Sequence, residues 1–317
     1  MLAEPQLHWG AEALWEQLAP VLPGLSVEVV RSVASTNSAL LDRARAAPQR
    51  REHRADADAD ADADAGAHAE PVQVRSSIES AAFGRRAIDM QPCLLVAEQQ
   101  TAGRGRHGRA WHAEPGASLT FSLSVPLNAA DASGLSLAVG VALCEALDPA
   151  AAPGTHRIAL KWPNDLWLLD AGSPALGRKL GGVLIETVAA GTHRLVVVGV
   201  GLNVLPFDAP GINTGFAALH EIDASLTAPG VLARVALPLV QAIQQFEAEG
   251  FAAFANRFAA RDLLRGHAVR TTLADLPEGV ARGVAGNGGL WVESPAGLVC
   301  VSSGEVSVRP AAAPPLA

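Results

Sequence analysis

The chain has 317 residues, 49% of them hydrophobic, so it can bury a core as one large domain or two smaller ones. Its formal net charge of −8 argues against a general nucleic-acid binder. No secretory signal opens the sequence and no apolar run is long enough to cross a membrane, so we predict a cytoplasmic protein.

The first expected strand covers residues 25–33, where apolar and polar residues alternate. A helix is expected directly after it, and one of three consecutive residues can cap its start: Ser35, Thr36 or Asn37. Residues 55–65 then alternate alanine with five aspartates, which are poor strand formers and repel one another. We therefore predict a disordered insertion over about residues 45–90 that carries no chemistry.

A buried strand over 93–100 runs directly into the stretch TAGRGRHGRAW, residues 101–111. Alternation over 118–125 predicts the hairpin partner of that strand. Farther along the chain the sequence predicts one helix over 134–147 and three strands over 157–162, 179–188 and 193–204.

A long helical region is expected over 230–263, with four phenylalanines as core contacts: Phe246, Phe251, Phe254 and Phe258. Beyond it, short β runs joined by glycine turns predict a small barrel of about five strands. We therefore expect an α+β fold with one domain over 1–263 and a small β-barrel domain over 264–317.

The stretch 101–111 places three glycines and three arginines in eleven positions. The glycines allow the backbone to bend closely around a ligand, and the arginines supply planar charged groups that suit phosphate or carboxylate. These residues are Gly103, Gly105 and Gly108, with Arg104, Arg106 and Arg109. The alternative is a solvated basic loop that binds RNA loosely.

The stretch KWPNDLWL, residues 161–168, contains a second candidate site. Pro163 interrupts a strand edge, and Asn164 and Asp165 favour a turn. The carboxylate of Asp165 could hold Mg²⁺ or a ligand hydroxyl. The alternative is a side-chain hydrogen bond that only stabilises the turn.

Two glycine-containing strands supply further candidates. Lys179 opens an apolar strand beside Gly181 and Gly182, where a lysine needs an anionic partner and the missing side chains leave room for one. The alternative is an edge lysine whose ammonium group reaches water. Gly199 and Gly201 share one face of the next strand, as if a flat group lay against it, unless they mark a β-bulge.

In chain order, five motifs resemble those of the biotin–protein ligases, or biotin–[acetyl-CoA carboxylase] ligases: STN, EQQTAGRGRHGRAW, KWPNDLWL, RKLGGVLIE and VVVGVGLNV. The resemblance runs from about residue 26 to 309, apart from the insertion. It implies a class II synthetase-like α+β domain with a central mixed, mostly antiparallel sheet, followed by a small SH3-like barrel. Because only about 25 residues precede the first strand, we expect no N-terminal DNA-binding domain.

The family's reaction implies biotin and MgATP as substrates and the biotin carboxyl carrier protein of acetyl-CoA carboxylase as partner. The carboxylate of biotin attacks the α-phosphate to give biotinoyl-5′-AMP and pyrophosphate, and a carrier lysine then attacks this mixed anhydride. A fixed group of cations would stabilise the negative charge that gathers in both steps. Neither DNA nor a membrane is expected as a partner, a homodimer is left open, and the metal ligands are unknown.

The resemblance also implies roles for single residues. Lys179 would be the main catalytic side chain, assisted by Arg106 and Asp165. Biotin would be contacted by Ser35, Thr36, Asn37, Gln100, Gly103, Arg104, Gly105, Arg106, Lys179, Gly182, Gly199 and Gly201. ATP or the adenylate would be contacted by Arg106, Arg109, Trp111, Asn164, Lys179, Asn203 and Phe216. The segment over about 205–220, which contains Phe216, would close over the adenylate.

Three other functions account for parts of the sequence. A lipoate–protein ligase or octanoyl transferase would share a related fold but gives no reason for the GRGRxGRxW pattern. A nucleic-acid-binding protein would use the arginine-rich stretch and the β-rich tail, but it leaves Lys179 unexplained. A biotin-sensing repressor would need the DNA-binding domain that we do not expect.

Overall fold

The computed structural model describes residues 7–46, 82–83, 91–128, 131–149, 154–170, 176–190, 193–208, 215–302 and 308–310. The alternating Ala/Asp tract and most of the predicted insertion lie outside the described residues. All of the candidate site residues named above lie within them.

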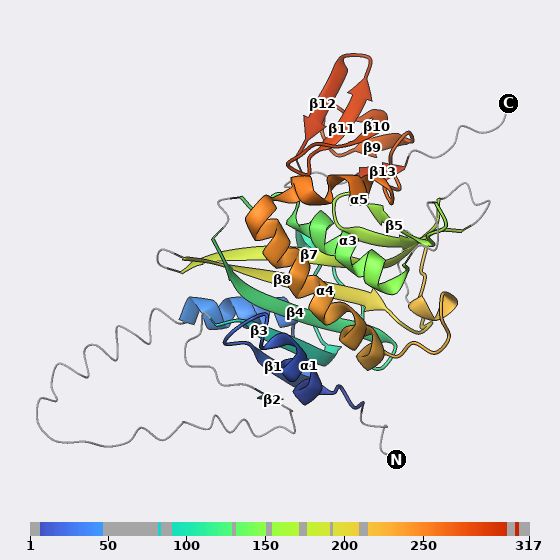
Figure 1. Cartoon of the computed structure of the whole chain (residues 1–317). Helices are drawn as coiled ribbons and strands as arrows, with labels where there is room; N and C mark the ends of the chain where they lie inside the picture. Colours follow the sequence, from blue (N-terminus) through green and yellow to red (C-terminus); the bar gives the residue numbers. More distant parts are fainter. Residues whose placement is uncertain are drawn as a thin grey trace, which may run out of the picture.

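An eight-stranded sheet forms the centre of the protein, in the order β2-β1-β3-β4-β8-β7-β6-β5 (Figure 1). The strands are β1 Ser26–Val33, β2 Ala82–Phe83, β3 Cys93–Gln100, β4 Ser118–Leu127, β5 Ile158–Lys161, β6 Asp165–Leu168, β7 Arg178–Ala190 and β8 His193–Asn203. Only β1 and β3 among these paired strands run parallel. The expected mixed, mostly antiparallel sheet and the hairpin pairing of β3 with β4 are therefore confirmed.

Three helices cover one face of this sheet: α1 Ala11–Leu18, α3 Leu135–Leu147 and α4 Ala228–Glu249. Figure 1 shows α3 and α4 side by side across the strands. Alternate residues of β4 and β8, such as Phe121 and Val198, enter the core that these helices share, because successive side chains of a strand point to opposite faces. Short helices over Phe251–Phe254 and Ala255–Ala259 (α5) follow α4, and all four expected phenylalanines are buried.

The opposite face of the sheet is covered by the helix over 36–46, whose Leu40, Leu41 and Ala44 pack against residues such as Leu95 and Val197. The start of this helix is capped as expected: the Ser35 hydroxyl accepts from the backbone N–H of Ser38 at 3.4 Å. This second face, rather than the one covered by α3 and α4, holds the candidate site.

Three elements were not predicted: α1, β6 and β2, which lies within the predicted insertion and pairs with β1. Gly10 precedes α1 and offers no side-chain cap, so the usual signal for the start of a helix is missing. The strand β6 has four residues and exists because it pairs with β5 on one side and β7 on the other. Such long-range pairing leaves little trace in a four-residue pattern.

Five strands follow α5, which confirms the expected number: β9 Ala268–Thr271, β10 Glu278–Val284, β11 Leu290–Ser294, β12 Gly297–Val301 and β13 Val308–Pro310. Their order is β12-β11-β10-β9-β13, and no pairing between the described residues of β12 and β13 closes it. The closed barrel is therefore not confirmed. The indole Nε1 of Trp162 donates to the Gly288 carbonyl at 2.9 Å, which ties this sheet to the larger one.

Candidate functional site

The glycine- and arginine-rich stretch forms a tight hairpin directly after β3. The backbone N–H of Gly105 donates to the Arg109 carbonyl at 2.7 Å, and that of Trp111 donates to the Gly103 carbonyl at 2.9 Å. A Cβ atom on Gly103 would lie 2.5 Å from the Trp111 carbonyl oxygen, so the close approach of the two arms requires glycine there. The two arms of the hairpin therefore close on each other, and the bending of this stretch around a ligand stays a prediction.

The candidate lysine has the anionic partner that its position predicts. The Nζ atom of Lys179 lies 2.8 Å from Oδ1 of Asp165, and Nζ of Lys161 lies 3.8 Å from Oδ2 of the same carboxylate. Asp165 is the first residue of β6, where it pairs with Lys161 on β5 and with Gly182 on β7. Burial raises the pKa of Asp165, but the charges of Lys179, Lys161 and Arg106 together outweigh it, so this pKa lies below its ordinary value.

These contacts bear on the alternatives left open for Asp165 in KWPND, and its role toward a ligand stays a prediction. The turn covers residues 162–164, and Asp165 belongs to the strand that follows. Its carboxylate is engaged by two ammonium groups, which makes it a poor ligand for a third cation. Asn164 has a structural contact: its side-chain Nδ2 donates to the Val183 carbonyl at 2.7 Å.

Arg106 approaches the same carboxylate from the hairpin. Burial lowers the pKa of Arg106, whereas the charge of Asp165 raises it and that of Arg109 lowers it further. The guanidinium group stays protonated because its ordinary pKa is so high. Arg106 is half-buried, whereas Arg109 is exposed.

The residues of the STN motif form a buried polar cluster with Gln100 and Ser122. The backbone N–H of Thr36 donates to Oε1 of Gln100 at 2.8 Å. The hydroxyl of Ser122 lies 2.6 Å from Oγ1 of Thr36 and 2.6 Å from Oδ1 of Asn37. Ser35, Thr36 and Asn37 are each 3% exposed. The structure therefore brings three of the predicted biotin-contacting residues, Thr36, Asn37 and Gln100, together as one hydrogen-bonded group.

Glu186 on β7 connects this cluster to the arginine hairpin. One carboxylate oxygen, Oε2, accepts from Nδ2 of Asn37 at 2.9 Å, and the other forms an ion pair with Nη2 of Arg104. Nη1 of Arg104 donates to the Ser38 hydroxyl at 3.0 Å. Of the three hairpin arginines, Arg104 is thus the one held against the helix start.

The glycines of β8 lie against two side chains of the site. A Cβ atom on Gly199 would lie 2.2 Å from Oδ1 of Asn37, and one on Gly201 would lie 2.5 Å from Cε2 of Trp111. The flat group expected against this strand is therefore the Trp111 indole ring. Its centroid lies 5.9 Å from Nζ of Lys179. The β-bulge alternative is wrong, because the register of β8 with both neighbours runs without a shift.

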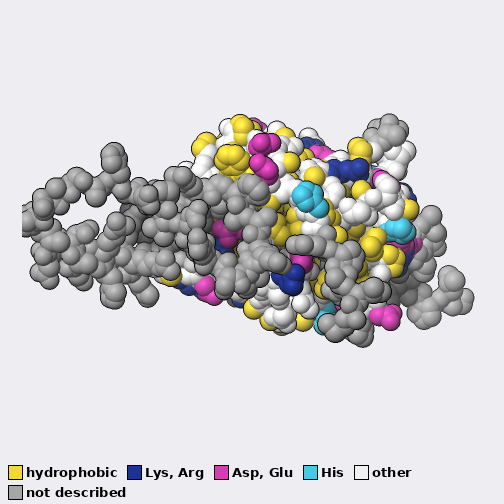
Figure 2. Space-filling view, turned by 90° about the horizontal axis from the view of Figure 1, so that it is seen from below, with side chains coloured by type: hydrophobic (Ala, Val, Ile, Leu, Met, Phe, Trp, Pro, Cys, Tyr) yellow, Lys and Arg dark blue, Asp and Glu magenta, His cyan; other side chains and the backbone are white. Residues whose placement is uncertain are grey.

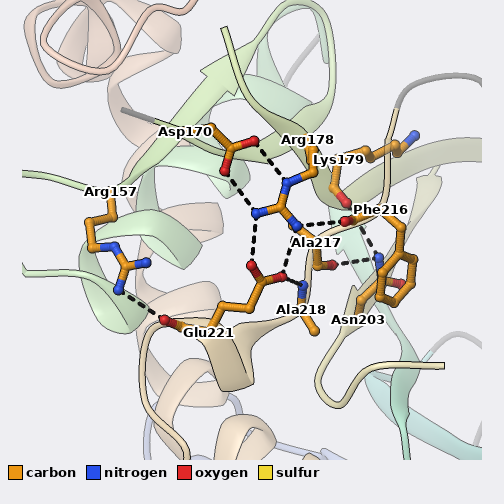
Figure 3. Close-up of polar contacts among 9 residues, drawn as sticks. All are labelled: Arg157, Asp170, Arg178, Lys179, Asn203, Phe216, Ala217, Ala218 and Glu221. Atoms are coloured by element: carbon orange, nitrogen blue, oxygen red, sulfur yellow. Dashed lines mark hydrogen bonds and ion pairs between the residues drawn. The ribbon is translucent and has the colours of Figure 1, made fainter. Parts of the chain in front are cut away.

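The segment around Phe216 is fixed beside Lys179 (Figure 3). The backbone N–H of Ala217 donates to the Lys179 carbonyl at 2.9 Å, and Nδ2 of Asn203 donates to the Ala217 carbonyl at 3.0 Å. The ring of Phe216 packs edge-on against Phe207 with centroids 4.8 Å apart. Of the predicted closing segment 205–220, residues 209–214 lie outside the described residues.

Arg178 is the centre of the network drawn in Figure 3. Its guanidinium group binds the carboxylates of Asp170, at 2.8 Å, and of Glu221, at 2.7 Å, and its Nη1 donates to the Phe216 carbonyl at 2.8 Å. Figure 3 shows the Lys179 ammonium directed away from this network. Neighbouring residues of β7 therefore have separate tasks, because Arg178 ties the Phe216 segment to the sheet while Lys179 enters the site.

Sequence reasoning missed four residues of this arrangement: Lys161, Arg178, Glu186 and Ser122. One signal was available for Ser122. The polar positions of β4 are all hydroxyl residues, namely Ser118, Thr120, Ser122 and Ser124, and all four are buried. A strand face exposed to water would be expected to carry charged residues, so an alternating run of only Ser and Thr indicates a buried polar face.

Three further observations concern the expectations about nucleic acid, metal ions and membranes. On the face shown in Figure 2, the visible basic groups stand singly or beside acidic groups rather than as a continuous stripe. Within the described parts of the chain, no three His, Cys, Asp or Glu side chains form a metal-binding group. None of the described helices combines the length and apolarity that crossing a bilayer requires.

Known proteins resemble this chain over the region that contains most of the candidate site. Residues 85–203 match the model of the biotin/lipoate A/B protein ligase family. The chain is 34% identical over 226 residues to the biotin–[acetyl-CoA-carboxylase] ligase of Mycobacterium tuberculosis, covering 69% of this chain and 79% of that protein. It is 34% identical to the bifunctional ligase/repressor BirA of Salmonella typhimurium, but that match spans 66% of the relative's length, just under two thirds.

Solved structures show the same likeness. The biotin protein ligase from Aquifex aeolicus in complex with biotin and ATP is 29% identical, with a TM-score of 0.57 over 69% of this chain and 89% of that one. A mutant of the ligase from the same organism, in complex with biotin, gives a TM-score of 0.62 over 90% of this chain and 98% of that chain. At 23% identity, this second likeness concerns the fold.

Proposed function

Because the chain belongs to the biotin–protein ligase family, we propose that it attaches biotin, at the expense of ATP, to a lysine of the biotin carboxyl carrier protein of acetyl-CoA carboxylase. The observation that carries this proposal is the contact of Lys179 and Lys161 with one carboxylate, that of Asp165, close to the charge of Arg106 and next to a buried hydroxyl and amide cluster. Such a site suits a substrate with a polar head and a carboxylate that is to be activated.

In the first step, a carboxylate oxygen of biotin attacks the α-phosphorus of MgATP. The bond from that phosphorus to the bridging oxygen of the β-phosphate breaks, and pyrophosphate leaves with the bonding electrons. Lys179 and Arg106 stabilise the charge on the phosphoryl oxygens, and Arg109 contacts the outer phosphates. Removing one fixed hydrogen-bond donor from a developing oxyanion costs about 100-fold to 1,000-fold in the kcat of other enzymes. Asp165 positions the Lys179 ammonium group.

In the second step, the amine of the carrier lysine attacks the acyl carbon of biotinoyl-5′-AMP. The amide bond forms, the bond from the acyl carbon to the phosphate oxygen breaks, and AMP leaves while the amine loses a proton. The same cations stabilise the AMP phosphate as it departs. No covalent enzyme intermediate is needed in either step.

The hydroxyl and amide cluster favours biotin over the alternative substrates, lipoate and octanoate. Thr36, Asn37, Gln100 and Ser122 offer donors and acceptors that match the N–H and C=O groups of a ureido ring. A dithiolane ring or an alkyl chain would cover these groups without bonding to them, which is unfavourable in a buried site. Gly182 of β7 would form part of the wall along the ligand, whereas Gly199 and Gly201 of β8 would act through Asn37 and Trp111, which lie against them.

The proposal extends to further features. We propose that Mg²⁺ enters with ATP as the MgATP complex, and that Trp111, Asn203 and Phe216 line the adenylate. We also propose the division into a catalytic domain over 1–263 and an SH3-like barrel over 264–317, supported by the five short strands at the C-terminal end. A cytoplasmic location would place the protein with its carrier substrate.

Intact-mass measurement tests the proposed function. The purified protein is incubated with MgATP and a biotin carboxyl carrier domain, together with biotin, lipoate or octanoate in separate reactions. We expect one biotinyl group on the carrier lysine in the first reaction and an unmodified carrier in the others. Transfer of lipoyl or octanoyl groups without biotinyl transfer would establish the alternative function.

A further inference from the structure

Lysine is almost absent from this chain. Of its 24 Lys and Arg residues, two are lysines, Lys161 and Lys179, and the rest are arginines. Both lysines contact the same carboxylate: their Nζ atoms lie 3.8 Å and 2.8 Å from the two oxygens of Asp165. A chain that uses arginine at every other basic position therefore uses lysine at the two positions that share one buried acid.

The two lysines differ in how firmly they are held. The Lys161 side chain is 9% exposed, and its Nζ atom lies 5.6 Å from the centroid of the Trp167 ring, which is itself buried. The Lys179 side chain is 27% exposed and faces the Trp111 ring. Lys161 is thus held in the protein interior beside the Asp165 carboxylate, whereas the more exposed Lys179 has room to turn toward a ligand.

This difference matters in the proposed reaction, on which the inference rests. Lys179 must bind the substrate carboxylate and the α-phosphate, and its share in the ion pair with Asp165 then weakens. A buried carboxylate that loses a counter-ion is strongly destabilised unless another cation compensates it. We propose that Lys161 is a positioning residue that keeps Asp165 charged while Lys179 engages the substrate.

The charges facing Asp165 come from three elements: Lys161 on β5, Lys179 on β7 and Arg106 on the hairpin. Burial raises the pKa of Asp165, and these three cations together hold it below its ordinary value. An ammonium group suits this confined place because it is a compact point charge, whereas a guanidinium group is a wide planar fork. Of the three cations, Lys161 has the least exposed side chain and is not assigned to any substrate.

The test uses the full-length variants Lys161→Met and Lys161→Arg in a biotin-dependent pyrophosphate-release assay over a range of pH. We expect Lys161→Met to lower kcat by about tenfold or more, with the KM for biotin within about twofold because the polar cluster of Thr36 and Asn37 is intact. In Lys161→Met the acid limb of the pH profile of kcat moves to higher pH, because Asp165 is protonated more readily when one neighbouring cation is removed. Lys161→Arg restores the charge and recovers part of both effects.

Arg270→Met provides the matched control, since it removes one positive charge from an ion pair with Glu278 in which both side chains are 65% exposed. A Lys161→Met protein with the kcat and pH profile of the wild type would overturn the inference. So would an Arg variant that folds, by its Tm, but shows no recovery over Met. If Lys161→Met does not fold, the pH profile of kcat for Lys161→Arg is the test. A lower kcat without a shift of the acid limb of that profile would contradict the inference. Failure of the wild type to release pyrophosphate with biotin would instead overturn the proposed function.

Discussion

The ammonium nitrogen of Lys179 lies 2.8 Å from the carboxylate of Asp165, at the place where β6 and β7 pair. This contact supplies the anionic partner that a lysine at the head of an apolar strand requires. It also directs the ammonium group toward Trp111 and away from the Arg178 network on the other side of the strand. The position of the lysine is therefore set by the sheet rather than by a loop.

The first prediction concerns Lys179 itself. Lys179→Ala should fold, because Lys161 remains beside Asp165, but it should lose at least about 100-fold in the rate of biotin-dependent pyrophosphate release. Exposed Arg270→Ala serves as the control for the loss of a positive charge. A Lys179→Ala protein that releases pyrophosphate at the wild-type rate would remove Lys179 from the chemistry.

The second prediction concerns retention of the adenylate. Arg106 lies on the hairpin and near Asp165, so Arg106→Ala should let biotinoyl-5′-AMP dissociate about tenfold faster or more. Filter retention of labelled adenylate measures the rate. Arg282→Ala, on the exposed surface of β10, is the control. Equal retention by Arg106→Ala and the wild type would show that the hairpin does not hold the intermediate.

The third prediction concerns the glycine wall. In Gly199→Ala the added methyl group would lie 2.2 Å from Oδ1 of Asn37, so the amide must move and its bonds to Ser122 and Glu186 must break. We expect biotin affinity, measured by calorimetry without ATP, to fall by about tenfold or more. Gly286→Ala is the matched control, because no atom lies within 4 Å of the added group. Unchanged biotin affinity in Gly199→Ala would show that Asn37 does not contribute to biotin binding.

The fourth prediction concerns stability. The Arg261 side chain is 7% exposed and binds the Asp148 carboxylate at 3.2 Å and the Ile158 carbonyl at 2.9 Å, which ties the end of α3 to β5. Arg261→Met leaves Asp148 without this counter-ion, so the free energy of unfolding should fall by about 3 kcal/mol. Arg270→Met, which removes the exposed pair with Glu278, should lower the free energy of unfolding by less than about 1 kcal/mol. Urea denaturation measures both free energies of unfolding. Equal losses in the two variants would show that burial does not make the Arg261 ion pair more important to stability than the exposed one.

Local pattern predicted most of the long elements and the glycine-rich motifs. β1, β3, β4, β7 and β8 were predicted because alternation or an apolar run extends over eight residues or more in each. β6 was not predicted, since its four residues depend on partners on both sides. The barrel was inferred from five short strands, but closure depends on which edges meet, and the described pairings leave β12 and β13 apart.

The site was predicted as a set of motifs, without the contacts that join them. The need of Lys179 for an anion followed from its sequence position, but nothing local indicated that Asp165 was that anion or that Lys161 shared it. Glu186 lies seven residues after Lys179 on β7 and reaches Asn37 and Arg104 only through the fold. Long-range pairing of strands brings these residues together, and sequence spacing does not encode it.

A crystal structure of the protein with biotin and a non-hydrolysable ATP analogue would show whether Lys179 and the arginine hairpin bind both substrates. The account predicts the ureido ring among Thr36, Asn37 and Ser122, with the biotin carboxylate and the α-phosphate both at the Lys179 ammonium group and Arg106 closing over them. Density for both ligands elsewhere, with Lys179 and the hairpin far from either, would contradict it.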